Sequence, residues 1–151
     1  MKILTFLAEG FEETEAVTVM DLLIRAGFEV EAVSVSNEIV ISGAHGIKLK
    51  ADSLLSQSDV NSADAIFLPG GVPGVPNLTS SPQVLEIIKN FDKARKWIFA
   101  ICAAPSVLEA AGVLKGRTVT CYPSWAEKIK SAKVVIITCF FLSRAHKRIF
   151  L

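Results

Sequence analysis

The sequence predicts one α/β domain built around a mainly parallel β-sheet. Apolar, strand-like segments alternate along the chain with helix-like segments, which is the pattern of βαβ units. Of the 151 residues 51% are hydrophobic, as is typical of parallel sheets that helices cover on both faces. No internal repeat or linker-like stretch divides the chain, so a single domain over residues 1–151 is expected.

A βαβ unit and a hairpin are expected in the N-terminal part of the chain. The βαβ unit is predicted from an apolar strand, an amphipathic helix that stops at a glycine, and an alternating strand, at residues 2–8, 12–27 and 28–35. Residues 38–52 carry Gly43 and Gly46 between two short β-prone runs, which predicts a small β-hairpin at the edge of the sheet.

Strands and helices continue to alternate after the hairpin. The segment 64–71 is expected to be a buried strand that ends in a glycine pair, and 80–94 a helix that opens with serine and proline in capping positions. A strand over 97–101 is expected to lead into a helix over 105–112, and a last short strand is expected over 117–123.

Cys102 stands where an expected strand changes into a helix. Largely apolar residues lead into it, and Pro105, which suits a first helical turn, follows three positions later. A thiol at such a junction would face free N–H groups and the positive end of the helix dipole, which lower a cysteine pKa. Buried packing is the alternative role, because free cysteines are among the most buried residues. Cys121 and Cys139, each inside an apolar stretch, are expected only to pack in the core.

Acidic residues and a glycine pair are expected beside this thiol, because the carboxyl ends of parallel strands meet at one edge of a sheet. Gly70 and Gly71 could present N–H groups to an oxyanion, or form an ordinary turn. Glu12, Glu13 and Glu15 fall in the first turns of a helix, where the dipole alone favours carboxylates. A glutamate held close to a thiolate, however, could serve as an acid or a base.

Composition narrows the classes of partner. The formal net charge is +1 and no dense basic patch precedes the C-terminal end, which argues against nucleic-acid and membrane-surface binding and leaves small molecules or proteins. Three cysteines without a CxxC pair predict neither a disulfide framework nor a zinc site, and no cofactor is expected. The first apolar run is too short for a signal peptide and no stretch reaches the ~18 apolar residues of a membrane span, so a cytoplasmic protein is expected.

Three motifs in order, AEGFEETEA, LPGG and AICAAP, resemble the ThiJ/PfpI superfamily and within it the DJ-one branch. The similarity runs from Met1 to about Lys133. It implies a flavodoxin-like, three-layer α/β sandwich, usually found as a homodimer. It also implies a cysteine-dependent glyoxalase or protein deglycase, a redox-responsive chaperone or, in the PfpI branch, a cysteine peptidase.

Carried over by position, the resemblance makes Cys102 the nucleophile and Glu15 the carboxyl group that hydrogen-bonds it. The oxyanion pocket is matched by Gly70, Gly71 and the backbone N–H of Ala103. Tyr122 stands where some members have a histidine, and with a pKa of ~10 it cannot replace an imidazole base. Chemistry that needs only Cys102 and Glu15 is unaffected by this change.

Residues 134–151 depart from the family pattern. They lack the final strand, the glycine-proline-glycine-threonine turn and the closing helix, and read as an apolar run with a basic, aromatic end. Loss of a covering helix would expose a sheet face and lower the stability. His45 and His146 have no motif that recruits them and are expected to be ordinary exposed side chains.

Four hypotheses about the function stay open. The first is an enzyme in which Cys102 attacks small carbonyl substrates such as methylglyoxal, or glycated proteins, and Glu15 assists. The second is a redox-sensing holdase chaperone that responds to peroxide through a low-pKa thiolate. A cysteine peptidase is least supported, because no histidine lies near the thiol in the sequence, and a folded but inactive remnant is the fourth.

Overall fold

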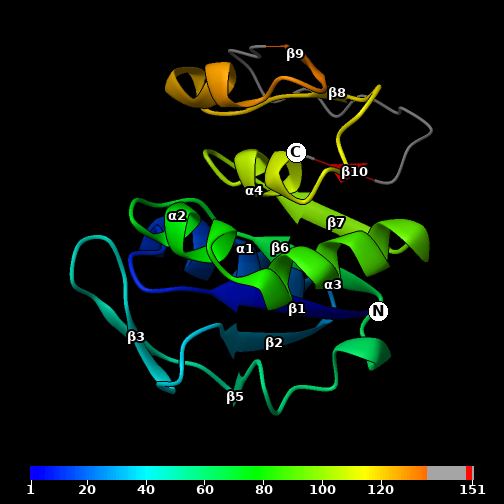
Figure 1. Cartoon of the computed structure of the whole chain (residues 1–151). Helices are drawn as coiled ribbons and strands as arrows, with labels where there is room; N and C mark the ends of the chain where they lie inside the picture. The colour runs from blue at the N-terminus through cyan, green and yellow to red at the C-terminus, as the bar shows by residue number, and fades with distance from the viewer. Residues whose placement is uncertain (136–148, 151) are drawn as a thin grey trace.

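The computed structural model describes residues 1–135 and 149–150, and a six-stranded sheet lies at its centre (Figure 1). The strands of this sheet are β1 (Lys2–Leu7), β2 (Glu29–Ser34), β5 (Ser53–Leu54), β6 (Ala65–Leu68), β7 (Trp97–Ala100) and β10 (Ile149–Phe150). Their spatial order is β10-β7-β6-β1-β2-β5, and every neighbouring pair is parallel. The predicted parallel α/β fold is therefore confirmed.

Helices cover both faces of this sheet. They are α1 (Glu13–Arg25), α2 (Gly74–Thr79), α3 (Pro82–Lys93) and α4 (Pro105–Ala110). Apolar residues of α2, α3 and α4 pack with Leu4 and Ile66 in the largest core cluster, whereas α1 packs over Ile3 and Phe67 on the opposite face. These two faces give the sandwich its three layers.

Local capping sets the bounds of the predicted helices. The Ser81 hydroxyl accepts a hydrogen bond from the Val84 N–H (3.3 Å) and Pro82 occupies the first turn of α3, as the capping pattern predicts. Gly27, with φ +83°, follows the end of α1. Helix α2 is not predicted from the sequence, because Gly74 and Pro76 within it are typical of a loop.

The predicted hairpin is confirmed as β3 (Val40–Ser42) paired antiparallel with β4 (Lys48–Lys50). The hairpin forms a separate two-stranded sheet. In the sequence it lies between β2 and the edge strand β5. The hairpin lies against the loop that follows β1: the Gly10 N–H donates to Ser42 O (2.8 Å) and the Ala44 N–H to Phe11 O (2.8 Å). The hairpin therefore supports the loop at the carboxyl end of β1.

Residues 118–134 form a small layer beyond α4. It consists of β8 (Thr118–Val119) paired parallel with β9 (Lys133–Val134), and the 3-10 helix η2 (Pro123–Lys128) between them. Another 3-10 helix, η1 (Val60–Ser62), precedes β6. The predicted strand at 117–123 is confirmed only at its start, since Pro123 begins η2.

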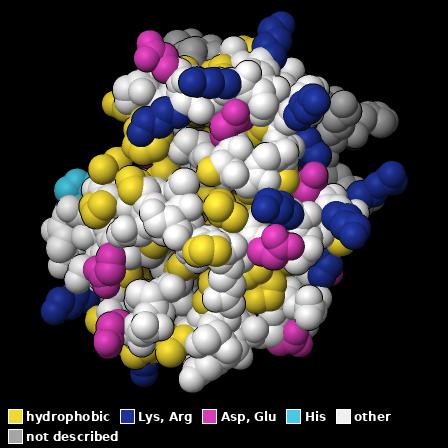
Figure 2. Space-filling view, in the orientation of Figure 1, with side chains coloured by type: hydrophobic (Ala, Val, Ile, Leu, Met, Phe, Trp, Pro, Cys, Tyr) yellow, Lys and Arg dark blue, Asp and Glu magenta, His cyan; other side chains and the backbone are white. Residues whose placement is uncertain are grey.

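The predictions for Cys139, His146 and most of the atypical tail concern residues 136–148, outside the part that the structure describes. Within that part no helix is both long and apolar enough to cross a membrane. On the face shown in Figure 2, Lys and Arg side chains are interspersed with acidic ones, in keeping with the net charge of +1.

Candidate active site

Cys102 lies in the sharp turn between β7 and α4. Its backbone has φ +57°, a left-handed conformation that is uncommon for a residue with a side chain. The Tyr122 N–H donates to Cys102 O (2.7 Å), which ties the turn to the segment before η2. Non-glycine residues held in this region of φ are strained and occur preferentially at functional sites, as at the nucleophile of a strand-to-helix elbow.

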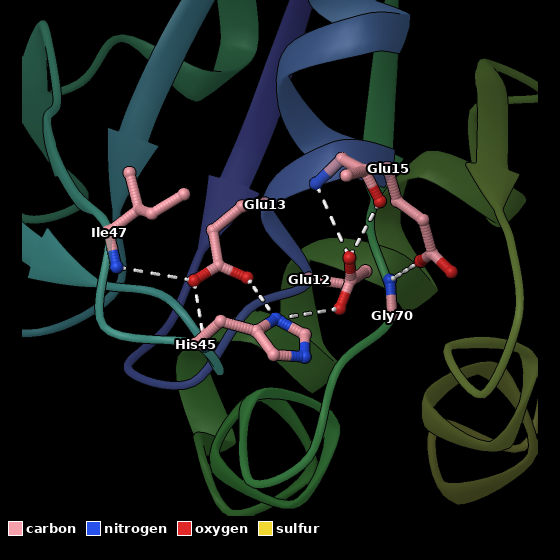
Figure 3. Close-up of polar contacts among 7 residues, drawn as sticks. Glu12, Glu13, Glu15, His45, Ile47 and Gly70 are labelled. Atoms are coloured by element: carbon pink, nitrogen blue, oxygen red, sulfur yellow. Dashed lines mark hydrogen bonds and ion pairs between the residues drawn. The ribbon is translucent and has the colours of Figure 1, made fainter.

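Glu15 and Gly70 meet beside the Cys102 sulfur. The Gly70 N–H donates to Glu15 Oε2 over 2.7 Å (Figure 3). A methyl group added to Gly70 would lie 2.6 Å from Glu15 Oε2, 2.8 Å from Cys102 Cβ and 3.2 Å from its Sγ. Only glycine leaves room for this three-way contact. Its N–H is engaged by Glu15, so the structure differs from the expectation that Gly70 offers its N–H to an oxyanion.

Gly71 and Ala103 supply the two other N–H groups that the family resemblance assigns to the oxyanion pocket. Gly71, with φ +105°, has an N–H without a hydrogen-bond partner among the described residues. The Ala103 N–H is hydrogen-bonded to the Cys102 side chain. The Ala103 N–H thus lies at the sulfur, Gly71 directly follows the Gly70 that contacts it, and the oxyanion role of both residues stays a prediction.

The pKa of Cys102 is raised to about 11, and the expectation of a lowered value is wrong. Burial raises it most, followed by a hydrogen bond with Glu15 and the charge of Glu15; the Ala103 N–H lowers it, and Glu12 raises it further. α4 begins only at Pro105, which has no N–H, so the first position of this helix offers the sulfur no donor. Cys102 is therefore held as a thiol next to a carboxylate.

Glu12, Glu13 and His45 form a second polar cluster at the start of α1. Burial raises the pKa of Glu13, but hydrogen bonds from the His45 side chain and from backbone N–H groups outweigh it and bring the pKa to about 2. The Glu13 carboxylate in turn raises the pKa of His45. Ligand atoms of the three residues lie within 4.8 Å of one another, and the ion pairs of His45 with Glu13 (2.8 Å) and Glu12 (3.5 Å) account for that arrangement.

This cluster was missed in the sequence, where His45 looked like an ordinary exposed side chain. It is exposed, but its ring nitrogen is paired. The available signal was a histidine at a hairpin tip that follows an acidic loop, and only the fold shows that the two segments meet.

Tyr122 and Cys121 border the site from the segment before η2. Tyr122 reaches Cys102 through its backbone N–H, whereas its side chain is largely exposed (55%). Cys121 is buried, as predicted, and burial raises its pKa.

Comparison with known proteins shows the family to which this chain belongs. The sequence model of the DJ-1/PfpI family matches residues 1–138 of the chain. The chain belongs to the DJ-1/PfpI family. Its motif residues Glu15, Gly70 and Cys102 thus lie together in a member of the family to which their sequence pattern points.

The relatives of this chain carry names that point to different activities. The chain is 37% identical over 136 residues to Protein DJ-1 homolog B of Arabidopsis thaliana, covering 89% of this chain and 31% of that protein. It spans about a third of the length of the Arabidopsis relatives DJ-1 homologs A and B. It is 32% identical to Deglycase TK1284 of Thermococcus kodakarensis (87% of this chain, 78% of that protein) and to the putative cysteine protease YraA of Bacillus subtilis (89% and 83%).

Solved structures of family members superpose on most of the chain. Drosophila melanogaster DJ-1beta matches with a TM-score of 0.90 at 28% identity, covering 98% of this chain and 78% of that one. A cysteine-to-alanine mutant of a DJ-1 superfamily protein from Salmonella typhimurium matches with a TM-score of 0.88 at 32% identity, with the same coverage. The flavodoxin-like fold expected from the resemblance is therefore confirmed.

Proposed function

We propose that this protein is a cysteine-dependent enzyme acting on reactive carbonyls, of the glyoxalase or protein deglycase type. The observation that carries the proposal is the contact of Cys102 with Glu15 beside Gly70, in a strained strand-to-helix turn. A thiol next to a carboxylate can lose its proton to that carboxylate as the sulfur attacks, so a high resting pKa does not prevent nucleophilic catalysis. The relative named as a deglycase supports the same chemistry.

The proposed reaction with methylglyoxal balances without a cofactor. The Cys102 sulfur bonds to the aldehyde carbon as its proton passes to Glu15, and Glu15 hands that proton on to the carbonyl oxygen, which gives a hemithioacetal and restores the carboxylate. The N–H groups of Gly71 and Ala103 are the proposed donors to this oxygen. Glu15 then moves the proton of that carbon to the neighbouring carbon by way of an enediol, which gives a thioester. Water cleaves the thioester, restores the thiol and releases a hydroxy acid.

Substitution of the two central residues tests the proposal. Cys102→Ser and Glu15→Gln should each lower the rate of hydroxy-acid formation from methylglyoxal, on the order of a hundredfold or more. Cys121→Ser is the matched control, because Cys121 is buried near the site but not part of the chemistry. Full activity of Cys102→Ser would refute the enzyme proposal.

A redox-sensing chaperone is the second candidate. Cys102 is partly exposed whereas Cys121 is buried, so oxidation would be selective for Cys102. A related solved structure is that of oxidized Toxoplasma gondii DJ-1. The raised pKa of Cys102 disfavours rapid reaction with peroxide, since the thiolate is the reactive form. Equal peroxide sensitivity of Cys102 and Cys121 would count against this candidate.

A cysteine peptidase, which the name of YraA suggests, has less support. Such an enzyme needs an imidazole beside its thiol. In the described part of the chain the histidine is His45, whose ring nitrogen pairs with Glu13.

The partners proposed for the enzyme are small dicarbonyls or glycated proteins and a second copy of the chain. The reactive thiol requires a compartment that keeps cysteines reduced. The homodimer, inferred from the family resemblance, is testable by light scattering of the purified protein.

A further inference from the structure

We propose that Glu13 is a positioning residue for the Cys102 site, which it holds in shape through the hairpin tip (residues 43–47) and the β1 loop (residues 8–12). The inference rests on the proposed role of Cys102 as the reactive thiol. Glu13 and Glu15 belong to the same turn of α1 but reach in different directions: Glu13 toward the hairpin, Glu15 toward Gly70 (Figure 3).

The hairpin tip is built around the Glu13 carboxylate. Glu13 is only 5% exposed, and it accepts hydrogen bonds from the N–H groups of His45 (2.7 Å) and Ile47 (3.4 Å). His45 Nδ1 lies 2.8 Å from its second oxygen. A methyl group on Gly43 would lie 2.3 Å from the Glu13 carboxyl carbon, so the tip closes on this side chain without spare room. Removing a buried carboxylate would leave these donors without their acceptor.

The hairpin in turn fixes the β1 loop. The Gly10 N–H donates to Ser42 O and the Ala44 N–H to Phe11 O, each over 2.8 Å. A backbone bridge joins Phe11 and Gly43. The loop therefore cannot shift without breaking contacts to the hairpin.

The β1 loop fixes the glycine turn beside the sulfur. The Glu12 N–H donates to Gly70 O (2.9 Å) and the Gly74 N–H to Gly10 O (2.9 Å). A methyl group on Gly71 would lie 2.4 Å from the Glu12 nitrogen, which shows how closely the two backbones pack. Because Gly70 contacts both Glu15 and Cys102, a continuous set of contacts leads from Glu13 to the sulfur.

Loss of this support should make Cys102 more reactive toward small alkylating agents and less effective in turnover. Burial is the largest cause of the raised Cys102 pKa, and contact with Glu15 is the next. A glycine turn that moves away weakens both, so the Cys102 pKa falls toward its ordinary value and the sulfur becomes more accessible.

The test measures alkylation of Cys102 and Cys121 by iodoacetamide at pH 8, resolved by peptide mass spectrometry, together with the melting temperature. Glu13→Ala removes the carboxylate, and Glu13→Gln keeps an acceptor for the N–H groups of the tip. Glu31→Ala is the matched control: Glu31 is a partly buried carboxylate bound by Ser53, Ser58 and Lys2, none of which belongs to the tip, the β1 loop or the glycine turn.

We expect the ratio of Cys102 to Cys121 alkylation rates to rise about threefold or more in Glu13→Ala, as for a pKa fall of about half a unit. Glu13→Gln should stay near the wild-type ratio, and Glu31→Ala should lower the melting temperature without changing the ratio. A wild-type ratio in Glu13→Ala, or an equal rise in Glu31→Ala, would overturn the inference.

If Glu13→Ala does not fold, His45→Ala decides, because His45 is exposed and its removal takes away one donor to Glu13. A raised ratio in that variant supports the inference and an unchanged ratio overturns it. Alkylation requires no turnover, so absence of methylglyoxal conversion would refute the proposed function and leave this test unaffected.

Discussion

Cys102 and Glu15 show why the protonation state of a thiol depends on its tertiary neighbours. The local pattern predicted a thiolate favoured by a helix terminus, but the sulfur is partly buried and faces a carboxylate. A sulfur that keeps its proton is less prone to oxidation, since the thiol is the less reactive form. In the proposed reaction, the strained turn at Cys102 and its contact with Gly70 would hold the thiol beside Glu15 for transfer of its proton.

Gly71 gives a prediction at the scale of one residue. Gly71→Ala would place a methyl group 2.4 Å from the Glu12 nitrogen and 2.5 Å from Gly10 O at a φ of +105°. Chemical denaturation should show a loss of about 1–3 kcal/mol in the free energy of unfolding.

Gly116→Ala is the matched control for this prediction. Gly116 also has a positive φ (+72°), but a methyl group there meets nothing within 4 Å. It should therefore cost less than Gly71→Ala, and a cost equal to that of Gly71→Ala would show that close packing at Gly71 contributes nothing.

The contact between the hairpin and α1 gives a prediction at the scale of elements. The pKa of Glu13 falls from 4.5 to about 2 on folding, so its contribution is present above pH 4.5 and is lost as the pH falls toward 2. The pKa of His45 is raised above 6.5, so its contribution is present below pH 6.5 and is lost as the pH rises through the folded-state value.

Both contributions are therefore complete between about pH 4.5 and pH 6.5. Hydrogen exchange of the His45 and Ile47 amides, corrected for intrinsic rates, should show the greatest protection in that range. In His45→Asn, which does not titrate there, the loss of protection on the alkaline side should disappear. Protection that rises steadily above pH 7 in the wild type would contradict the prediction.

How far the elements follow from the sequence depends on whether their signals are local. Periodicity and the Ser81–Pro82 cap were sufficient to predict α3, and the apolar runs predicted β1, β6 and β7. The contact of Glu13 with His45 joins residues 32 positions apart, so no local pattern contains it. The predicted lowering of the Cys102 pKa was wrong for the same reason, because Glu15 and the residues that bury the sulfur belong to other elements.

At the scale of the whole molecule, the site lies where the strand order reverses. The strands β2 and β5, which follow β1 in the chain, lie on one side of β1. The later strands β6, β7 and β10 lie on the other side. The first turn of α1, which follows β1, supplies Glu15, and the loops after β6 and β7 supply Gly70 and Cys102, as expected for a crevice beyond the carboxyl ends of parallel strands.

The single domain expected over residues 1–151 leads to a prediction for unfolding. One shared core should unfold in one cooperative step, so the fluorescence of Trp97 and Trp125 and the far-UV circular dichroism should give the same denaturation midpoint. Trp97 belongs to β7 and Trp125 to η2, which places the two reporters in the main sheet and in the small layer beyond α4. Two separate midpoints would show that this layer folds independently.

The central position of β1 has a consequence for synthesis on the ribosome. The first strand to emerge is flanked on both sides by strands made later, so the sheet can grow outward from its own N-terminal segment. A nascent chain that has completed β1, α1 and β2 already contains Glu15, whereas β7 and the cysteine after it join on the other side much later. Cys102 is thus translated only after Glu15 and Gly70, the two residues that lie beside its sulfur.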